Sequence, residues 1–277
     1  MFLGYNTSGF AHHRLNDAVA ILTELGYTGI GLTPDVNHLD PEQPNHAGRI
    51  ALLRGEFRRT GLRCAIETGA RFLLDARRKH HPTLLSADET DRETRYDFLC
   101  DCVELARELG ADCVSFWSGA ADDNSEAVHM ERLAEACKRL AEFAAERNVR
   151  LAFEPEPGMF IDSMPKFAEL YEKVNHPAFG LTIDIGHLVC QRELPISAHL
   201  TNWAHVLWNV HIEDMRAGVH DHLMFGEGEV DFADAFAGLR AANYANGVYV
   251  ELSRHSYDAV NTARRAKAFL NPFIPQE

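Results

Sequence analysis

The sequence alternates eight times between a short apolar run and a longer segment of helical periodicity. The short runs are mostly apolar, as is typical of parallel strands that are covered on both faces. They span Phe2–Asn6, Gly29–Thr33, Arg63–Glu67, Asp112–Phe116, Arg150–Glu154, Gly180–Asp184, Trp208–Glu213 and Gly247–Leu252. The helical segments span Leu15–Leu25, His46–Arg59, Arg92–Leu109, Ser125–Arg147, Met164–Val174, Ile196–Val206, Phe232–Ala242 and Tyr257–Leu270.

No Pro-, Gly- or Ser-rich linker interrupts these eight units. They therefore predict an α/β fold with a single (β/α)8 TIM barrel domain over residues 1–277. A doubly wound open sheet is the alternative. The length fits, because such barrels typically need about 250 residues.

Charge and cysteine usage narrow the function classes. The chain has 27 Lys and Arg against 41 Asp and Glu, and a net charge of -14 disfavours attraction to nucleic acid or an anionic membrane. The start, MFLGYNTSGF, resembles no export signal, and no 18 apolar residues follow one another. The six cysteines form no CxxC pair. We expect a cytoplasmic protein, and exterior helices leave a homo-oligomer open.

Each of the last four predicted strands has, at or near its end, a residue of a type that binds metal ions. These residues are Glu154, Asp184, His211 and Glu251. The carboxyl ends of barrel strands meet at one opening, where active sites of this fold form. Three carboxylates placed together would repel one another, so the pattern favours a divalent cation between them. Mixed oxygen and nitrogen ligation suits Mn²⁺ best, with Mg²⁺, Co²⁺ or Zn²⁺ as alternatives.

Four motifs carry a family resemblance: FEPEPG around Glu154, DIGH at Asp184–His187, HIED at His211–Asp214 and HDHLMFGEGEVDF at His220–Phe232. In this order they resemble the xylose-isomerase-like barrel superfamily of sugar-phosphate isomerases and epimerases. That superfamily also contains ketose 3-epimerases, hydroxypyruvate isomerases, inosose dehydratases and apurinic endonucleases. The resemblance covers all eight units and is specific for the superfamily, not for one member.

The resemblance to ketose 3-epimerases implies roles for individual residues. It implies a single metal ion held by Glu154, Asp184, His211 and Glu251. It also implies that His187 and Arg216 bind substrate oxygens, with Glu156 as a further member of the polar shell. We also consider Trp117, which either stacks against a sugar or packs in the core.

These residues suit proton abstraction next to a carbonyl. A metal bound to the substrate oxygens stabilises the developing enediolate, and Glu154 and Glu251 are the candidate acid–base residues. We predict a metal-dependent isomerase or epimerase of a carbohydrate: a sugar, sugar acid or sugar phosphate. The alternatives are a dehydratase of an inosose-like polyol ketone and an apurinic-endonuclease-like phosphodiesterase. The early strands lack the histidines of the nucleases, although His220 and His222 leave a second metal open.

Two further segments have two interpretations each. The long loop Thr68–Asp91 carries a basic island, which is either a solvated excursion or a lid that brings cations to an anionic or polyhydroxyl substrate. Gly226 and Gly228 in GEGEVDF either form an ordinary turn or present backbone N–H groups to an anion.

Overall fold

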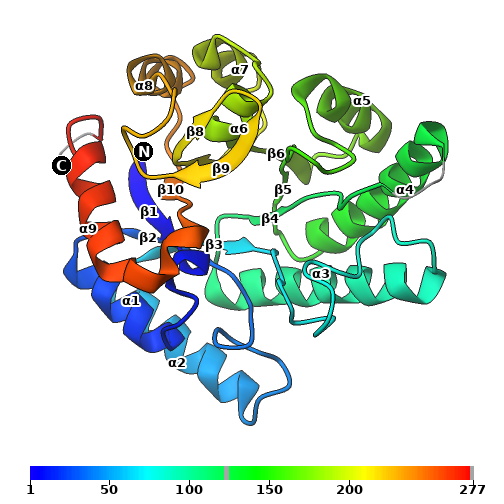
Figure 1. Ribbon diagram of the computed structural model, residues 1–277. Coiled ribbons are helices and arrows are strands. Elements are labelled where there is room, and N and C mark those ends of the chain that lie inside the picture. The colour runs from blue at the N-terminus through cyan, green and yellow to red at the C-terminus, as the bar shows by residue number, and fades with distance from the viewer. Residues whose placement is uncertain (122–124, 275–277) are drawn as a thin grey trace.

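Eight parallel strands close into a barrel in the computed structural model, which describes residues 1–121 and 125–274 (Figure 1). The strands are β1 (Phe2–Asn6), β2 (Gly29–Leu32), β3 (Arg63–Glu67), β4 (Val114–Phe116), β5 (Leu151–Phe153), β6 (Phe179–Asp184), β7 (Leu207–Ile212) and β10 (Gly247–Val250). They neighbour one another in chain order, and β10 closes the ring against β1 with Phe2 opposite Gly247. The predicted (β/α)8 barrel is confirmed.

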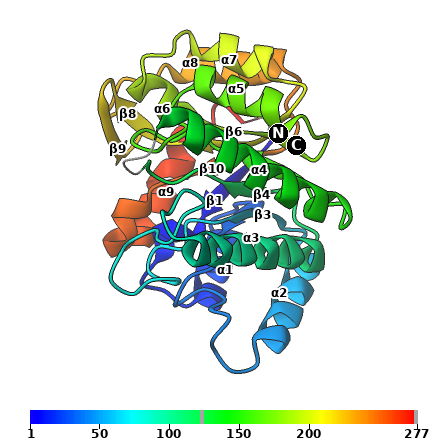
Figure 2. The ribbon, with the colours of Figure 1, turned by 90° about the vertical axis from the view of Figure 1, so that its right-hand side faces the viewer.

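Helices form the outer ring of the barrel (Figures 1 and 2). They are α1 (Leu15–Glu24), α2 (His46–Thr60), α3 (Glu89–Leu109), α4 (Glu126–Ala145), α5 (Met164–Val174), α6 (Ile185–Cys190), α7 (Ile196–Asn202), α8 (Phe232–Ala241) and α9 (Ala259–Leu270), with 3₁₀ turns η1 (Thr7–Phe10) and η2 (Ser253–Asp258). The prediction missed α6. This short helix starts directly after β6 because the Asp184 carboxylate accepts a hydrogen bond from the His187 N–H at 2.9 Å.

The barrel interior changes from apolar to polar along its axis. A small apolar cluster, separate from the main core, lies inside the barrel. Its members come from different strands or the residue just before a strand: Ala65, Cys113, Ala152 and Tyr249. Side chains of a strand alternate between its two faces, so the residue two positions later also points inward. Those residues are Glu67, Ser115, Glu154 and Glu251. The strand period therefore places a polar layer directly above an apolar plug.

The hairpin of β8 (Asp214–Arg216) and β9 (Val219–Leu223) follows β7 and was not predicted. Asp214, which is buried, anchors it. Its carboxylate accepts hydrogen bonds from four backbone N–H groups, those of Met215, Gly226, Gly228 and Val230, at 2.8 to 3.1 Å. The glycine segment does present N–H groups to an anion, but the anion is this side chain. The HIED and GEGEVDF motifs therefore hold each other in place.

The main core lies between the barrel wall and the surrounding helices. Among the described residues, none of the helices is both long enough and apolar enough to cross a membrane.

We predict that Asp214→Ala lowers the free energy of unfolding by about 2–4 kcal/mol, because it leaves buried N–H donors without an acceptor. Urea denaturation followed by circular dichroism measures this change. Asp97→Ala, at an exposed position of α3, is the matched control and should change stability little. An equal effect of both substitutions would show that Asp214 does not anchor the hairpin.

Candidate active site at the carboxyl end of the barrel

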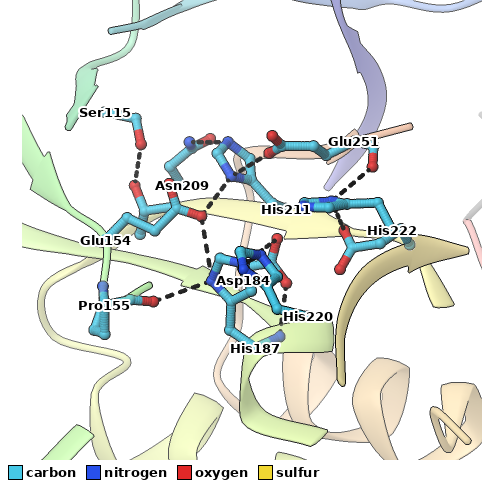
Figure 3. Close-up of polar contacts among 12 residues, drawn as sticks. Ser115, Glu154, Pro155, Asp184, His187, Asn209, His211, His220, His222 and Glu251 are labelled. Atoms are coloured by element: carbon cyan, nitrogen blue, oxygen red, sulfur yellow. Dashed lines mark hydrogen bonds and ion pairs between the residues drawn. The ribbon is translucent and has the colours of Figure 1, made fainter. Parts of the chain in front are cut away.

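Four residues from the ends of successive strands meet at the carboxyl end of the barrel (Figure 3). Glu154 follows β5, Asp184 ends β6, His211 lies in β7 and Glu251 follows β10. One potential ligand atom from each lies within 4.8 Å of those of the other three. The first three side chains are buried and Glu251 is partly exposed. The structure thus brings together the whole set that the sequence suggested as metal ligands.

His211 is the centre of this cluster. Its Nδ1 lies 2.9 Å from Glu154 Oε1 and 3.0 Å from Glu251 Oε2. On the other side of the ring, Nε2 lies 3.0 Å from Glu67 Oε1 and 3.1 Å from Asn209 Nδ2. Burial lowers the pKa of His211, but the charges of Glu67, Glu154 and Glu251 outweigh burial and raise this pKa well above its ordinary value.

The two carboxylates on Nδ1 differ in protonation behaviour. Burial raises the pKa of Glu154 to about 8, although the charge and hydrogen bond of His211 act in the opposite direction. Burial also acts to raise the pKa of Glu251, but His211, His222 and His187 together hold it below its ordinary value. Carboxylates with pKa values pushed apart by their surroundings are a common arrangement for acid–base chemistry.

Sequence reasoning did not give Glu67 a role, and the structure places it directly against His211. The residue closes β3 just as the candidate ligands close their own strands. This position at the end of a strand is the sequence feature from which a role for Glu67 could have been predicted. A carboxylate on the far nitrogen of a histidine fixes the orientation of its ring.

Asp184 and Glu213 have buried oxygens without partners. Asp184 Oδ1 caps α6, whereas Oδ2 has no hydrogen-bond partner among the described residues. The side chain of Glu213 is fully buried, and among the described residues no nitrogen donor lies within hydrogen-bond distance of its oxygens; His222 Nδ1 lies 3.9 Å from Oε2. Burial, the charge of Asp184 and a side-chain hydrogen bond shared with Asp184 raise the pKa of Glu213 well above its ordinary value. Glu213, Asp184 and His222 offer potential ligand atoms within 4.8 Å of one another, as do His187, His220 and His222.

A cavity of about 160 Å³ opens over this cluster. Three of the predicted substrate-binding residues, His187, Glu156 and Trp117, line it. His187 is fixed by contacts of 3.1 Å from Nδ1 to the Pro155 carbonyl oxygen and from Nε2 to His220 Nε2. Trp117 is buried and meets the His80 ring edge-on with 5.4 Å between ring centroids. Trp117 therefore packs in the wall of the cavity, and stacking against a sugar stays a prediction.

The fourth predicted substrate-binding residue, Arg216, lies outside the lining of this cavity, and its role stays a prediction. Arg216 lies at the exposed end of β8, and its Nη2 donates a hydrogen bond to the Glu227 carbonyl oxygen at 2.8 Å. It is not among the described residues that line the cavity. The unpredicted β8–β9 hairpin carries its side chain away. Arg254 of η2 lines the cavity instead.

The long basic loop also reaches the cavity. It ends earlier than predicted, because α3 begins at Glu89. Arg71, Lys79 and His80 from this loop are among the lining residues, whereas Arg77 and Arg78 are exposed. The loop is therefore not only a solvated excursion.

The fold and the carboxylate–imidazole cluster define a (β/α)8 barrel with a polar centre at its carboxyl end. The chain belongs to the xylose isomerase-like TIM barrel family, whose model matches residues 19–273. This confirms the resemblance seen in the motifs.

Individual relatives are more distant. L-ribulose-5-phosphate 3-epimerase UlaE of Shigella flexneri is 27% identical over 195 residues, covering 68% of this chain and 66% of that protein. The match thus spans slightly less than two thirds of the relative's length. Among solved structures, the IolI protein with a bound zinc atom has a TM-score of 0.79 at 16% identity and full coverage of both chains. D-allulose 3-epimerase from Methylomonas sp. has a TM-score of 0.76 at 18% identity, covering 99% of this chain and 98% of that one. These two likenesses support the fold.

We predict that Glu213→Met raises the free energy of unfolding of the metal-free protein by about 1–3 kcal/mol, because it replaces a buried carboxyl group beside Asp184, whose oxygens receive no hydrogen bond from a nitrogen donor among the described residues, with an apolar group of similar length. Thermal and urea denaturation in the presence of a chelator measure this. Glu135→Met on the exposed face of α4 is the control, with little expected change. A destabilised Glu213 variant would mean that its carboxylate makes a stabilising interaction.

Proposed function

We propose that this protein is a divalent-metal-dependent sugar epimerase that removes and returns a proton at a carbon next to a carbonyl. The placement of Glu154 and Glu251 carries this proposal. Both carboxylates contact the same nitrogen of His211, yet they come from β5 and β10, which lie on either side of β6 and β7 in the barrel. Two carboxylates that reach the substrate from separate strands suit removal of the proton from one face and its return to the other. The names of the 3-epimerase relatives agree with this proposal.

The residues fit a cation between them. Three carboxylates and an imidazole lie close together, and the buried Asp184 Oδ2 has no hydrogen-bond partner among the residues that the structure describes. Glu154, Asp184, His211 and Glu251 would hold the ion, and Mn²⁺ suits their mixed oxygen and nitrogen donors, with Zn²⁺, Co²⁺ or Mg²⁺ as alternatives. When bound, a divalent cation supplies Lewis-acid stabilisation of the negative charge that develops on the substrate oxygens.

The other lining residues position the sugar. The His187 imidazole, fixed by the Pro155 carbonyl and by His220, is placed to contact a substrate oxygen, and Glu156 supplies a second polar group. Trp117 offers the apolar edge of the wall to a sugar face. With one active carboxylate instead of two, the same site would transfer the proton between adjacent carbons and act as an aldose–ketose isomerase.

Solvent-deuterium exchange tests the reaction. The Mn²⁺-loaded protein is incubated in heavy water with ketopentoses and ketohexoses, and C–H exchange is followed by NMR. We expect exchange and formation of an epimer in at least one ketose, and loss of both on chelation. Glu251→Gln should keep the fold and lower turnover by about 10²–10⁴-fold, because it removes one proton-transfer group. An unimpaired variant would contradict the assigned role, and a product lighter by one water would favour a dehydratase.

Metal affinity tests the role of Glu67. We expect Glu67→Gln to weaken Mn²⁺ binding by about 10–100-fold, because the carboxylate that orients His211 is lost. Calorimetric titration of the chelator-treated protein measures affinity without requiring activity. Glu135→Gln should bind as the wild type does. Equal affinity in the two variants would show that Glu67 does not position the ligand.

A further inference from the structure

Cations from two distant segments converge on the mouth of the cavity. Arg71 and Lys79 come from the loop between β3 and α3, and Arg254 comes from η2, the turn after β10. All three line the same cavity as the carboxylate cluster. Partial burial lowers the pKa of Lys79, the charges of Arg71 and Arg254 lower it further, and the charge of Glu156 acts in the opposite direction, so the three cations lie within electrostatic reach of one another. A chain of net charge -14 therefore concentrates positive charge at one opening.

Neighbouring carboxylates only partly neutralise these cations. Asp35 pairs with Arg71, with 2.5 Å from the guanidinium Nη2 to Oδ2, and Asp221 pairs with Arg254. Within the described part of the chain, Lys79 has no carboxylate at ion-pair distance, and its side chain is exposed. Two ion pairs hold the arginines in position, and one ammonium group is left for a ligand.

A fourth cation lies behind the cavity wall. Arg95 is 1% exposed, and its guanidinium carbon lies 4.8 Å from the centre of the Trp117 ring. Its Nη2 donates a hydrogen bond to the Thr68 carbonyl oxygen at 2.8 Å, while Nη1 has no partner among the described residues. Buried charges normally have a counter-ion because their desolvation is costly. The Arg95 guanidinium, which has no counter-ion among the described residues, therefore adds positive electrostatic potential to the cavity wall at Trp117.

The cavity thus has two ends of opposite character. Glu154, His211 and Glu251 lie at its floor, where the strands end, whereas the lysine and two arginines of the loop and turn lie at its mouth. A neutral sugar needs only the floor and the hydrogen-bonding groups beside it. Charge-assisted contacts to a phosphate or carboxylate are stronger than neutral hydrogen bonds, and arginine and lysine are the residues that make them.

We propose that the mouth formed by Arg71, Lys79 and Arg254 binds a terminal oxyanion of the substrate, so that the enzyme acts on a sugar with a phosphate or carboxylate at the end remote from its carbonyl. This inference rests on the proposed function for the reaction at the floor. The oxyanion at the mouth orients the sugar, with its carbonyl end toward Glu154 and Glu251. A substrate without the anion loses the contact with Lys79.

The test compares matched substrates in the deuterium-exchange assay: a ketopentose, its 5-phosphate and a ketohexuronate. We expect kcat/KM for the phosphate or the uronate to exceed that for the neutral ketose by about 10–100-fold. Which of the two anions is preferred identifies the oxyanion. Lys79→Ala and Arg254→Gln should lower this ratio, chiefly through KM. Arg77→Ala, on the same loop but outside the cavity lining, should keep the wild-type ratio.

Binding of inorganic phosphate separates this inference from the reaction itself. Phosphate should raise the melting temperature of the wild type and of Arg77→Ala more than that of Lys79→Ala. If no ketose undergoes exchange but this difference remains, the epimerase proposal fails and the oxyanion site stands. If neutral and charged ketoses react equally well, and Lys79→Ala and Arg254→Gln leave their ratio unchanged, the oxyanion site is refuted and the epimerase proposal stands.

Discussion

The arrangement of this barrel end depends on several carboxylates held around one buried imidazole. Glu67, Glu154 and Glu251 all contact His211, and burial makes their mutual repulsion more costly than it would be in water. Such a cluster cannot form by its own attractions. The barrel imposes it, because each strand is fixed by its neighbours and by the apolar plug below the polar layer. Stability supplied by the scaffold is thus used to hold groups in a geometry that they would not adopt by themselves.

Two buried aspartates show how a structural carboxylate differs from one proposed to bind a metal ion. Asp214 accepts hydrogen bonds from four backbone N–H groups, so both of its oxygens are satisfied within the protein. Asp184 uses one oxygen to start α6, while its Oδ2 has no hydrogen-bond partner in the described part of the chain and lies 3.8 Å from His187 Nε2. Buried polar atoms without partners are rare, so an orphaned oxygen beside other ligand atoms indicates a position for an external group. The same residue type therefore fixes a hairpin in one place and belongs to the proposed metal site in the other.

The strand pattern allowed the barrel and the four clustered residues to be predicted, because strand ends and inward-facing alternation can be read from the sequence. Glu67 also ends a strand and could have been included on the same grounds. The position of Arg216 could not be predicted. It depends on where the chain reverses after β7, and the reversal is determined by hydrogen bonds that Asp214 accepts from backbone N–H groups up to 16 positions away. Arg254 was missed for a related reason, since only the folded chain shows that η2 and the β3–α3 loop share one cavity.

The opposite charges at floor and mouth serve different parts of the proposed reaction. The floor belongs to the strands, whose positions the barrel fixes, so it suits proton transfer that needs accurate geometry. The mouth belongs to a long loop and a turn, which can change without disturbing the barrel. Recognition of the substrate can therefore change independently of the reaction in a fold of this kind. The net negative charge of the protein would repel the anionic sugar that we propose as substrate. The basic loop at the mouth would offset this repulsion next to the cavity.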